Sequence, residues 1–197
     1  MAQNRARANN LQHLACHRTY HVEYHGFPHG AEASMEVEAI YQAPSSKTFK
    51  VVKESGSGLL LNRVLKRLLK SEEEAAHKQD ENALTPANYN FSLVGTEVVD
   101  DRPMYILYVE PKVTRQLLFR GRVWVDAQDF AVAKVEAQPA QNPSFWIKNT
   151  QIHHLYAKVG NLWLPQVTKS ETKVRLGGVA TLTIQYADYQ VESAQAM

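Results

Sequence analysis

The sequence predicts a mainly β (α+β) protein, with a single antiparallel sheet of about ten strands curled into a half-open barrel and plugged by one amphipathic helix. Apolar and polar residues alternate along most of the chain, which is the period of a strand with one buried face. Short turn sequences separate these segments and favour antiparallel neighbours. One stretch, at about residues 57–76, has helical spacing instead.

Three alternating segments precede this helix. The first includes Tyr20, Val22 and Tyr24, with polar residues between them. The second runs over residues 34–42, and the third is centred on Phe49 and Val51. Each is expected to place one face in the core and the other in water.

Leucines at three- and four-residue spacing mark the helix. Ser57 and Gly58 precede it, and it is expected to end near Ala76. Residues 79–88 are polar, contain Pro86 and are predicted to form a loop. One apolar stripe results, with basic residues mostly outside it, and its members are Leu59, Leu60, Leu61, Val64, Leu65, Leu68 and Leu69.

Strand patterns resume at Tyr89 and continue without a second helix. A meander of this length must curl or close to bury its apolar face. Residues 1–197 are expected to form one domain, with residues 1–16 as a poorly ordered or helical N-terminal segment. The predicted strands lie near residues 89–99, 104–110, 117–125, 130–137, 149–159, 162–174 and 179–191.

Composition narrows the class of function. The chain of 197 residues is 44% hydrophobic and 21% charged, as expected of a globular protein. A formal net charge of +2, with no long basic block, argues against nucleic acid as a partner. Cys16 is the one cysteine, so no internal disulfide can form. No run reaches the roughly 18 apolar residues of a transmembrane helix, so any membrane contact is expected to be peripheral at most.

Several short motifs resemble those of one protein superfamily. They are the run Gly121-Arg122-Val123-Trp124-Val125-Asp126, the following Val132-Ala133-Lys134-Val135-Glu136, Leu162-Trp163-Leu164-Pro165, and Asn142-Pro143-Ser144-Phe145-Trp146. Together with the order of strands and helix, these motifs resemble the LolA/LolB-like outer-membrane lipoprotein carriers, in their uncharacterised lipoprotein-sorting branch. The resemblance covers roughly residues 18–191.

The resemblance implies a half-open barrel in the periplasm that binds acyl chains of lipoproteins, other lipids or regulatory protein segments. No signal peptide is visible at the start of the sequence, so the periplasmic location takes that signal to have been removed. The main hypothesis is a carrier or sensor that binds an acyl lipid or lipoprotein in an apolar hollow between sheet and helix.

Nine apolar residues are the candidates for lining this hollow. Four lie on the helix, two on the strand near residues 104–110, and three are aromatic residues expected at the rim. Ordinary core packing would explain the same pattern. The candidates are Leu61, Val64, Leu65, Leu68, Met104, Ile106, Phe145, Trp146 and Trp163.

The strand at residues 104–109 is apolar on both faces. Met104 and Ile106 belong to one face, and Leu107 and Val109 to the other. Something should therefore cover both faces, either the rest of this chain or a second protein. The alternative hypothesis is a protein-binding module for regulation or assembly, with a protein partner or a second copy of the chain on this surface.

An enzyme is the least favoured class. The sequence lacks the G-x-S-x-G, H-E-x-x-H, P-loop and G-x-G-x-x-G patterns, and no cofactor is expected. His21, Glu23 and His25 would project from one strand face, and two imidazoles with a carboxylate can bind zinc or iron. Polar residues on a wet strand face explain the same pattern, so no metal site is predicted and this trio is the weak candidate.

Overall fold

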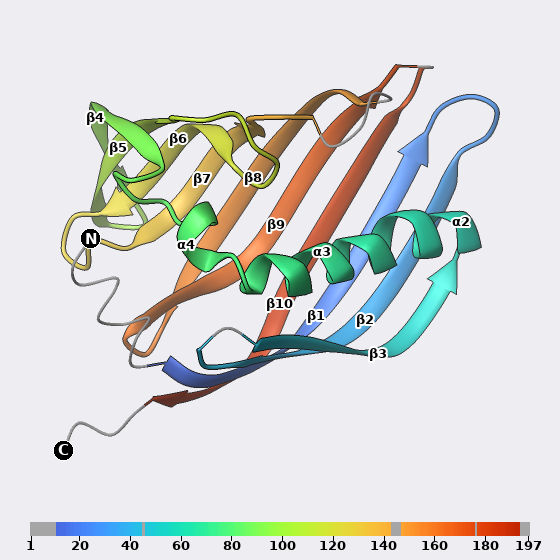
Figure 1. Ribbon diagram of the computed structural model, residues 1–197, viewed down its shortest axis with the longest axis horizontal. Helices are drawn as coiled ribbons and strands as arrows, with labels where there is room; N and C mark the ends of the chain where they lie inside the picture. Colours follow the sequence, from blue (N-terminus) through green and yellow to red (C-terminus); the bar gives the residue numbers. More distant parts are fainter. Residues whose placement is uncertain (1–10, 45, 143–146, 176, 194–197) are drawn as a thin grey trace.

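A computed structural model describes residues 11–44, 46–142, 147–175 and 177–193. It confirms the predicted fold class, with ten strands in one open antiparallel sheet and one long helical segment across a face of that sheet (Figure 1). The strands are β1 (Leu11–His25), β2 (Ala31–Gln42), β3 (Ser46–Gly56), β4 (Tyr89–Val99), β5 (Arg102–Pro111), β6 (Phe119–Asp126), β7 (Val132–Pro139), β8 (Ile147–Val159), β9 (Leu162–Val174) and β10 (Val179–Ser193).

The order of strands explains the path of the helix. The sheet runs β3-β2-β1-β10-β9-β8-β7-β6-β5-β4, so β3 and β4 form opposite edges although they follow one another in the chain. Their connection must therefore cross the whole sheet, and it does so diagonally as α2 (Gly58–Leu60), η1 (Leu61–Leu65), α3 (Lys66–Ala76) and α4 (Gln79–Asn82) (Figure 1). No helix in the described part of the chain is long and apolar enough to cross a membrane.

The helix agrees with its predicted limits of residues 57–76. Its stripe packs on the half of the sheet formed by β1, β2, β3 and β10, where it meets Tyr20, Val22, Met35, Val37 and Ile184. Leu65 is fully buried, whereas Leu59 is 66% exposed and lies off the stripe. The buried side chains of the segment are Leu60, Leu61, Leu65, Leu69 and Ala76.

A second apolar cluster lies on the same face of the sheet. Directly paired residues share a face, and the row Ile184, Thr168, His154, Val135 and Val123 links the helix-covered half to β6. The helix face therefore carries two apolar clusters with polar Thr168 and His154 between them. The buried members of the second cluster are Tyr89, Val109, Leu118, Val123, Val135 and Ala137.

The opposite face of β5 carries a third cluster. Met104 packs there with Trp124 and Ala133, and Ile106 and Trp163 lie against them. Leu107 and Val109 of the same strand point into the second cluster instead. Apolar residues on both faces of this strand thus pack within the chain itself, which accounts for its two-sided apolar pattern, whereas Tyr105 and Tyr108 are each 39% exposed.

The first strand begins earlier than predicted. Residues 11–16, expected in a poorly ordered or helical segment, form the first part of β1, where Leu14 pairs with Tyr41 of β2 and Val191 of β10. Register shifts between β1 and β10 follow Leu11 and Ala15. Strict alternation of apolar and polar residues does not predict this part of the strand. The register shifts interrupt it, and so do the polar residues between Leu11 and Leu14. Residues 1–10 lie outside the described part of the chain.

Candidate ligand-binding pocket

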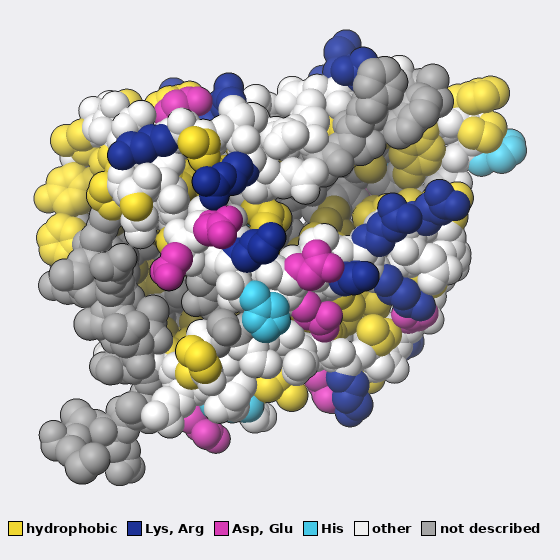
Figure 2. Space-filling model, viewed as in Figure 1, with side chains coloured by type: hydrophobic (Ala, Val, Ile, Leu, Met, Phe, Trp, Pro, Cys, Tyr) yellow, Lys and Arg dark blue, Asp and Glu magenta, His cyan; other side chains and the backbone are white. Residues whose placement is uncertain are grey.

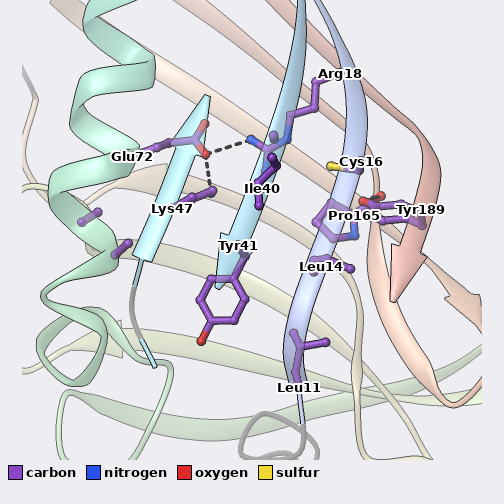
Figure 3. Close-up of a pocket in the computed structure, with 13 residues that line it drawn as sticks. Leu11, Leu14, Cys16, Arg18, Ile40, Tyr41, Lys47, Glu72, Pro165 and Tyr189 are labelled. Atoms are coloured by element: carbon purple, nitrogen blue, oxygen red, sulfur yellow. Dashed lines mark hydrogen bonds and ion pairs between the residues drawn. The ribbon is translucent and has the colours of Figure 1, made fainter. Parts of the chain in front are cut away.

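A pocket of about 480 Å³ lies between the C-terminal end of α3 and the sheet (Figure 3). Small-molecule sites commonly have volumes of about 300–1,000 Å³. Apolar residues make up most of its wall, and charged residues gather at one end. The lining residues are Leu11, Leu14, Cys16, Arg18, Ala39, Ile40, Tyr41, Lys47, Glu72, Ala75, Ala76, Pro165 and Tyr189.

Three charged side chains join the helix to the sheet at the polar end. One carboxylate oxygen of Glu72 on α3 accepts hydrogen bonds from Arg18 of β1 at 2.9 Å and from Lys47 of β3 at 2.6 Å. Arg18 is only 7% exposed. We call Arg18, Lys47 and Glu72 the pocket triad. It links segments 54 and 25 residues apart in the sequence, so it exists only when the helix is docked.

Aromatic rings hold the Arg18 guanidinium in place. Its central carbon lies 4.9 Å from the ring centre of Tyr186 and 5.3 Å from that of Phe49. Arg18 also donates a hydrogen bond to the Tyr20 hydroxyl at 3.2 Å. Cation–π contacts of this kind are worth more when the cation is shielded from water. These contacts therefore hold the positive charge of the Arg18 guanidinium at one position.

Burial and charge oppose one another in the pocket triad. Burial disfavours the charged forms of both Arg18 and Glu72, but their attraction prevails. The Glu72 carboxylate raises the pKa of Arg18, and Lys47 and Arg18 hold the pKa of Glu72 below its ordinary value of 4.5. With Arg18 and Lys47 as cations and Glu72 as an anion, the formal charges of the pocket triad sum to one positive charge.

The opposite end of the pocket is apolar. Leu11 and Leu14 of β1 lie there with Tyr41 of β2, away from Arg18 and Glu72 (Figure 3). The Tyr189 hydroxyl donates to the Pro165 carbonyl and so presents little unsatisfied polarity. The pocket therefore has the polarity of an amphiphile, with a charged group at one end and an apolar wall at the other.

Two signals in the sequence mark the pocket triad. Arg18 occupies the inward-facing series of β1 together with Tyr20 and Val22, where a charge is unexpected. Glu72 follows Leu65 and Leu69 at helical spacing, so it falls on the buried stripe of the helix. A charged side chain on an otherwise buried face needs a partner of opposite charge. Arg18 and Glu72 are such partners for one another.

The seven predicted hollow residues that the structure describes do not line this pocket. Leu61 and Leu65 are 8% and 0% exposed in the helix-covered core, with Val64 and Leu68 packed at its margin. Met104, Ile106 and Trp163 belong to the separate third cluster. Phe145 and Trp146 lie outside the described residues. The nine candidates therefore do not share one hollow, and a role for any of them in binding stays a prediction.

The side chains of the weak metal candidate form a hydrogen-bonded cluster. His21 Nε2 lies 2.8 Å from one Glu23 oxygen, and His25 Nε2 lies 3.4 Å from the other. The Ser34 hydroxyl lies 2.8 Å from His21 Nδ1. Potential ligand atoms of His21, Glu23 and Glu32 come within 4.8 Å of one another, whereas His25 is outside this set. These hydrogen bonds account for the positions of the side chains, and metal binding by this trio stays a hypothesis.

Comparison with known proteins gives similarity of overall structure alone. No family model and no curated protein matches the chain. A DUF1329 family protein from Desulfovibrio piger is 12% identical, with 96% of this chain and 90% of that one covered and a TM-score of 0.48. A protein described as an outer membrane lipoprotein-sorting domain, from Vibrio parahaemolyticus, is 9% identical over 97% and 90%, with a TM-score of 0.47.

A LolA superfamily protein from Nitrosomonas europaea is 11% identical over 100% of this chain and 94% of that one, with a TM-score of 0.39. These neighbours are of the kind that the sequence resembles. At such identities and scores the likeness says nothing about which molecule this chain binds. The pocket and its charges are the evidence on that question.

Proposed function

We propose that this chain is a non-catalytic carrier or sensor that binds an acyl chain in the pocket between α3 and the sheet. The observation that carries this proposal is the pocket itself, apolar at one end and closed by the pocket triad at the other. At roughly 30 Å³ per group, the volume that one water molecule occupies, a 480 Å³ pocket holds about 16 such groups. One acyl chain of a dozen carbons with its headgroup is of that size.

Movement of the helix would widen the site. Ala75 and Ala76 are small residues in the pocket wall, at the end of α3 where the chain leaves the leucine-rich stripe. Each buried leucine contributes about 1.5–3 kcal/mol, so complete release of the helix would need a ligand that replaces several such contacts. Displacement of the C-terminal end alone disturbs mainly Leu69 and the pocket triad.

The outward side of the helix fits a peripheral encounter with anionic lipid. Lys and Arg side chains gather there (Figure 2), and Arg63, Lys66, Arg67 and Lys70 are all exposed. Basic residues near an anionic surface attract it by about 1 kcal/mol each. We place the protein in the periplasm on the sequence resemblance, with acyl lipids or lipoproteins as cargo.

A pocket-filling variant tests the proposal. Ala75→Trp puts a large ring into the pocket wall, and Ser71→Trp puts the same ring on an exposed position of α3 outside that wall as the control. Titration calorimetry with dodecanoate should give saturable binding to the unmodified protein and to Ser71→Trp. Binding to Ala75→Trp should be at least about tenfold weaker, a loss of about 1.4 kcal/mol. Equal binding to all three would remove the pocket as the site.

A second candidate function is self-association through the β4 edge. Leu93 and Val98 are 65% and 68% exposed, and Tyr105 on the adjacent strand is 39% exposed. Hydrophobic side chains are visible at this edge in Figure 2. The other edge, β3, carries Lys47, Lys50 and Lys53, a common protection against strand pairing. A second copy could pair at β4 around a twofold axis.

Light scattering of the purified chain decides this alternative. A dimer that Val98→Lys converts to monomer, with Lys53→Gln unchanged as the control, would support the β4 interface. A monomer at all concentrations would remove it and leave the pocket as the basis of function.

A further inference from the structure

We propose that the ligand of this pocket is a monoanionic amphiphile, of the fatty-acid class, whose headgroup binds Arg18 and Lys47 and displaces Glu72 from them. The inference rests on the proposed function, since it names the chemistry of the ligand in the same pocket. Three independent features of the polar end support it.

The first feature is unbalanced charge. Both cations of the pocket triad share one oxygen of Glu72, at 2.9 Å from Arg18 and 2.6 Å from Lys47. The side chain of Arg18 is 9% exposed and that of Lys47 is 23% exposed, so water screens their positive charges poorly. Among the described residues, no other carboxylate pairs with either cation. The two cations carry one positive charge more than Glu72 balances, so an anion from outside the chain is attracted to them while Glu72 is still in place.

The second feature is an unused hydrogen-bond donor. Arg18 Nε is buried and has no hydrogen-bond partner among the described residues. The nearby Cys16 thiol interacts with the guanidinium, but sulfur is a weak acceptor. A buried donor left unpaired is destabilising, and native proteins rarely retain one without a water, an ion or a ligand to meet it. A carboxylate supplies two oxygens, which matches the fork of donors on an arginine.

The third feature is the direction of the pocket. Arg18 and Glu72 stand at one end, with Leu14 and Leu11 successively farther along β1 (Figure 3). An amphiphile with its headgroup at Arg18 would therefore lay its chain along the apolar wall. The opposite orientation would bury an alkyl end against two charges.

The headgroup and Glu72 compete for the same cations. Binding of the anion frees the Glu72 side chain, and with it the ionic tie between α3 and the sheet. The helix is then held by its leucine contacts alone. Ligand charge thereby controls how firmly the C-terminal end of α3 is docked.

Three ligands of equal chain length separate charge from chain. Dodecanoate, 1-dodecanol and dodecylamine are titrated at neutral pH into the unmodified full chain by calorimetry. Dodecanoate should bind about tenfold or more tightly than dodecanol, because a hydrogen-bonded ion pair with Arg18 and Lys47 is gained. Dodecylamine should bind more weakly than either, because it brings a third cation to the site.

Three variants locate the effect. Lys47→Gln should weaken dodecanoate binding about fivefold to tenfold and leave dodecanol unchanged. Glu72→Gln should strengthen dodecanoate binding, because the competing carboxylate is gone. Lys50→Gln is the matched control on the same strand, since Lys50 is 72% exposed and pairs with Glu38 outside the pocket. Circular dichroism of each variant confirms that it is folded before titration.

Each outcome has a distinct meaning. Equal affinity for dodecanoate and dodecanol would overturn the anionic headgroup and leave the acyl-binding function standing. A preference for dodecanoate that Lys47→Gln and Glu72→Gln do not alter would place the anion elsewhere and also overturn the inference. Absence of binding by all three ligands would overturn the proposed function together with it.

Discussion

Two ion networks in this molecule differ in whether they balance their own charge. The pocket triad sets two cations against one carboxylate. A second network, which we call the turn network, sets Arg102 and Lys158 against Asp126 and Asp129. The turn network is neutral by itself, whereas the pocket triad retains one positive charge. This difference separates an arrangement that holds the fold from one that is open to a ligand.

Both acids of the turn network also accept several hydrogen bonds. Asp126, which is fully buried, accepts two bonds from Arg102, at 2.6 and 2.9 Å, and two more from the backbone of Gln128 and Asp129. Asp129 accepts from Lys158 at 2.7 Å and from the Trp163 indole at 2.9 Å. These contacts tie the turn after β6 to β5, β8 and β9, and the network has no excess charge for a ligand to balance.

The largest expected effect is the loss of the buried acid in the turn network. Asp126→Asn removes the charge that faces Arg102 and should lower the free energy of unfolding by about 3 kcal/mol, because it breaks a buried pair from one side. Chemical denaturation measures this change, with the exposed Asp101→Asn as control. Dodecanoate binding by the folded variant should be unaltered. A change in its affinity would contradict the separation of the two networks.

A smaller and pH-dependent effect is expected in the pocket triad. Glu72→Gln should cost about 1–2 kcal/mol at neutral pH, through loss of charged hydrogen bonds. Because folding lowers the pKa of Glu72, its stabilisation is present above the ordinary value of 4.5 and is lost as the pH falls through the folded value. Denaturation curves from neutral pH to about pH 3 should thus converge for the variant and the unmodified protein. A constant difference across that range would contradict the ionic account.

The smallest effect concerns the polar row between the two apolar clusters. Burial lowers the pKa of His154, against the attraction of Glu72, so folding favours the neutral ring. Stability should decline as the pH falls below the ordinary value of 6.5, where the unfolded chain takes up a proton that the fold resists. His154→Asn should flatten this decline. The adjacent His153→Asn, on the other face of β8, should leave it in place, and the same response from both variants would contradict the assignment.

The sequence was sufficient for the ten strands and the leucine-rich helix. It missed α4 (Gln79–Asn82), which lies in the predicted loop, and it was insufficient for the site. Alternation located the strands and leucine spacing located the helix, because both periods are local properties. The start of β1 was missed, because register shifts interrupt its alternation and its pairing with the distant β10 is not a local property. Face assignment also failed for Met104 and Ile106. Alternation divides a strand into two faces but does not say which of them the helix will cover.

Arg18 and Glu72 also show that local sequence patterns do not predict contacts between distant segments. Each is visible in the sequence as a charge on an apolar face, yet only the fold brings them within 2.9 Å of each other. Their separation of 54 residues is bridged by the β3–β4 connection, which crosses the sheet because its strands lie at opposite edges. Topology therefore creates the pocket, and no local pattern contains that information.

Hydrogen exchange of the backbone amides, with and without saturating dodecanoate, tests the central claim most directly. If an acyl ligand enters the pocket and frees Glu72, amides near the end of α3, at residues 72–76, should exchange faster in its presence. Those of β6 and β7, beside the turn network, should be unchanged. Exchange that stays the same in α3, or that changes equally in both regions, would contradict the account.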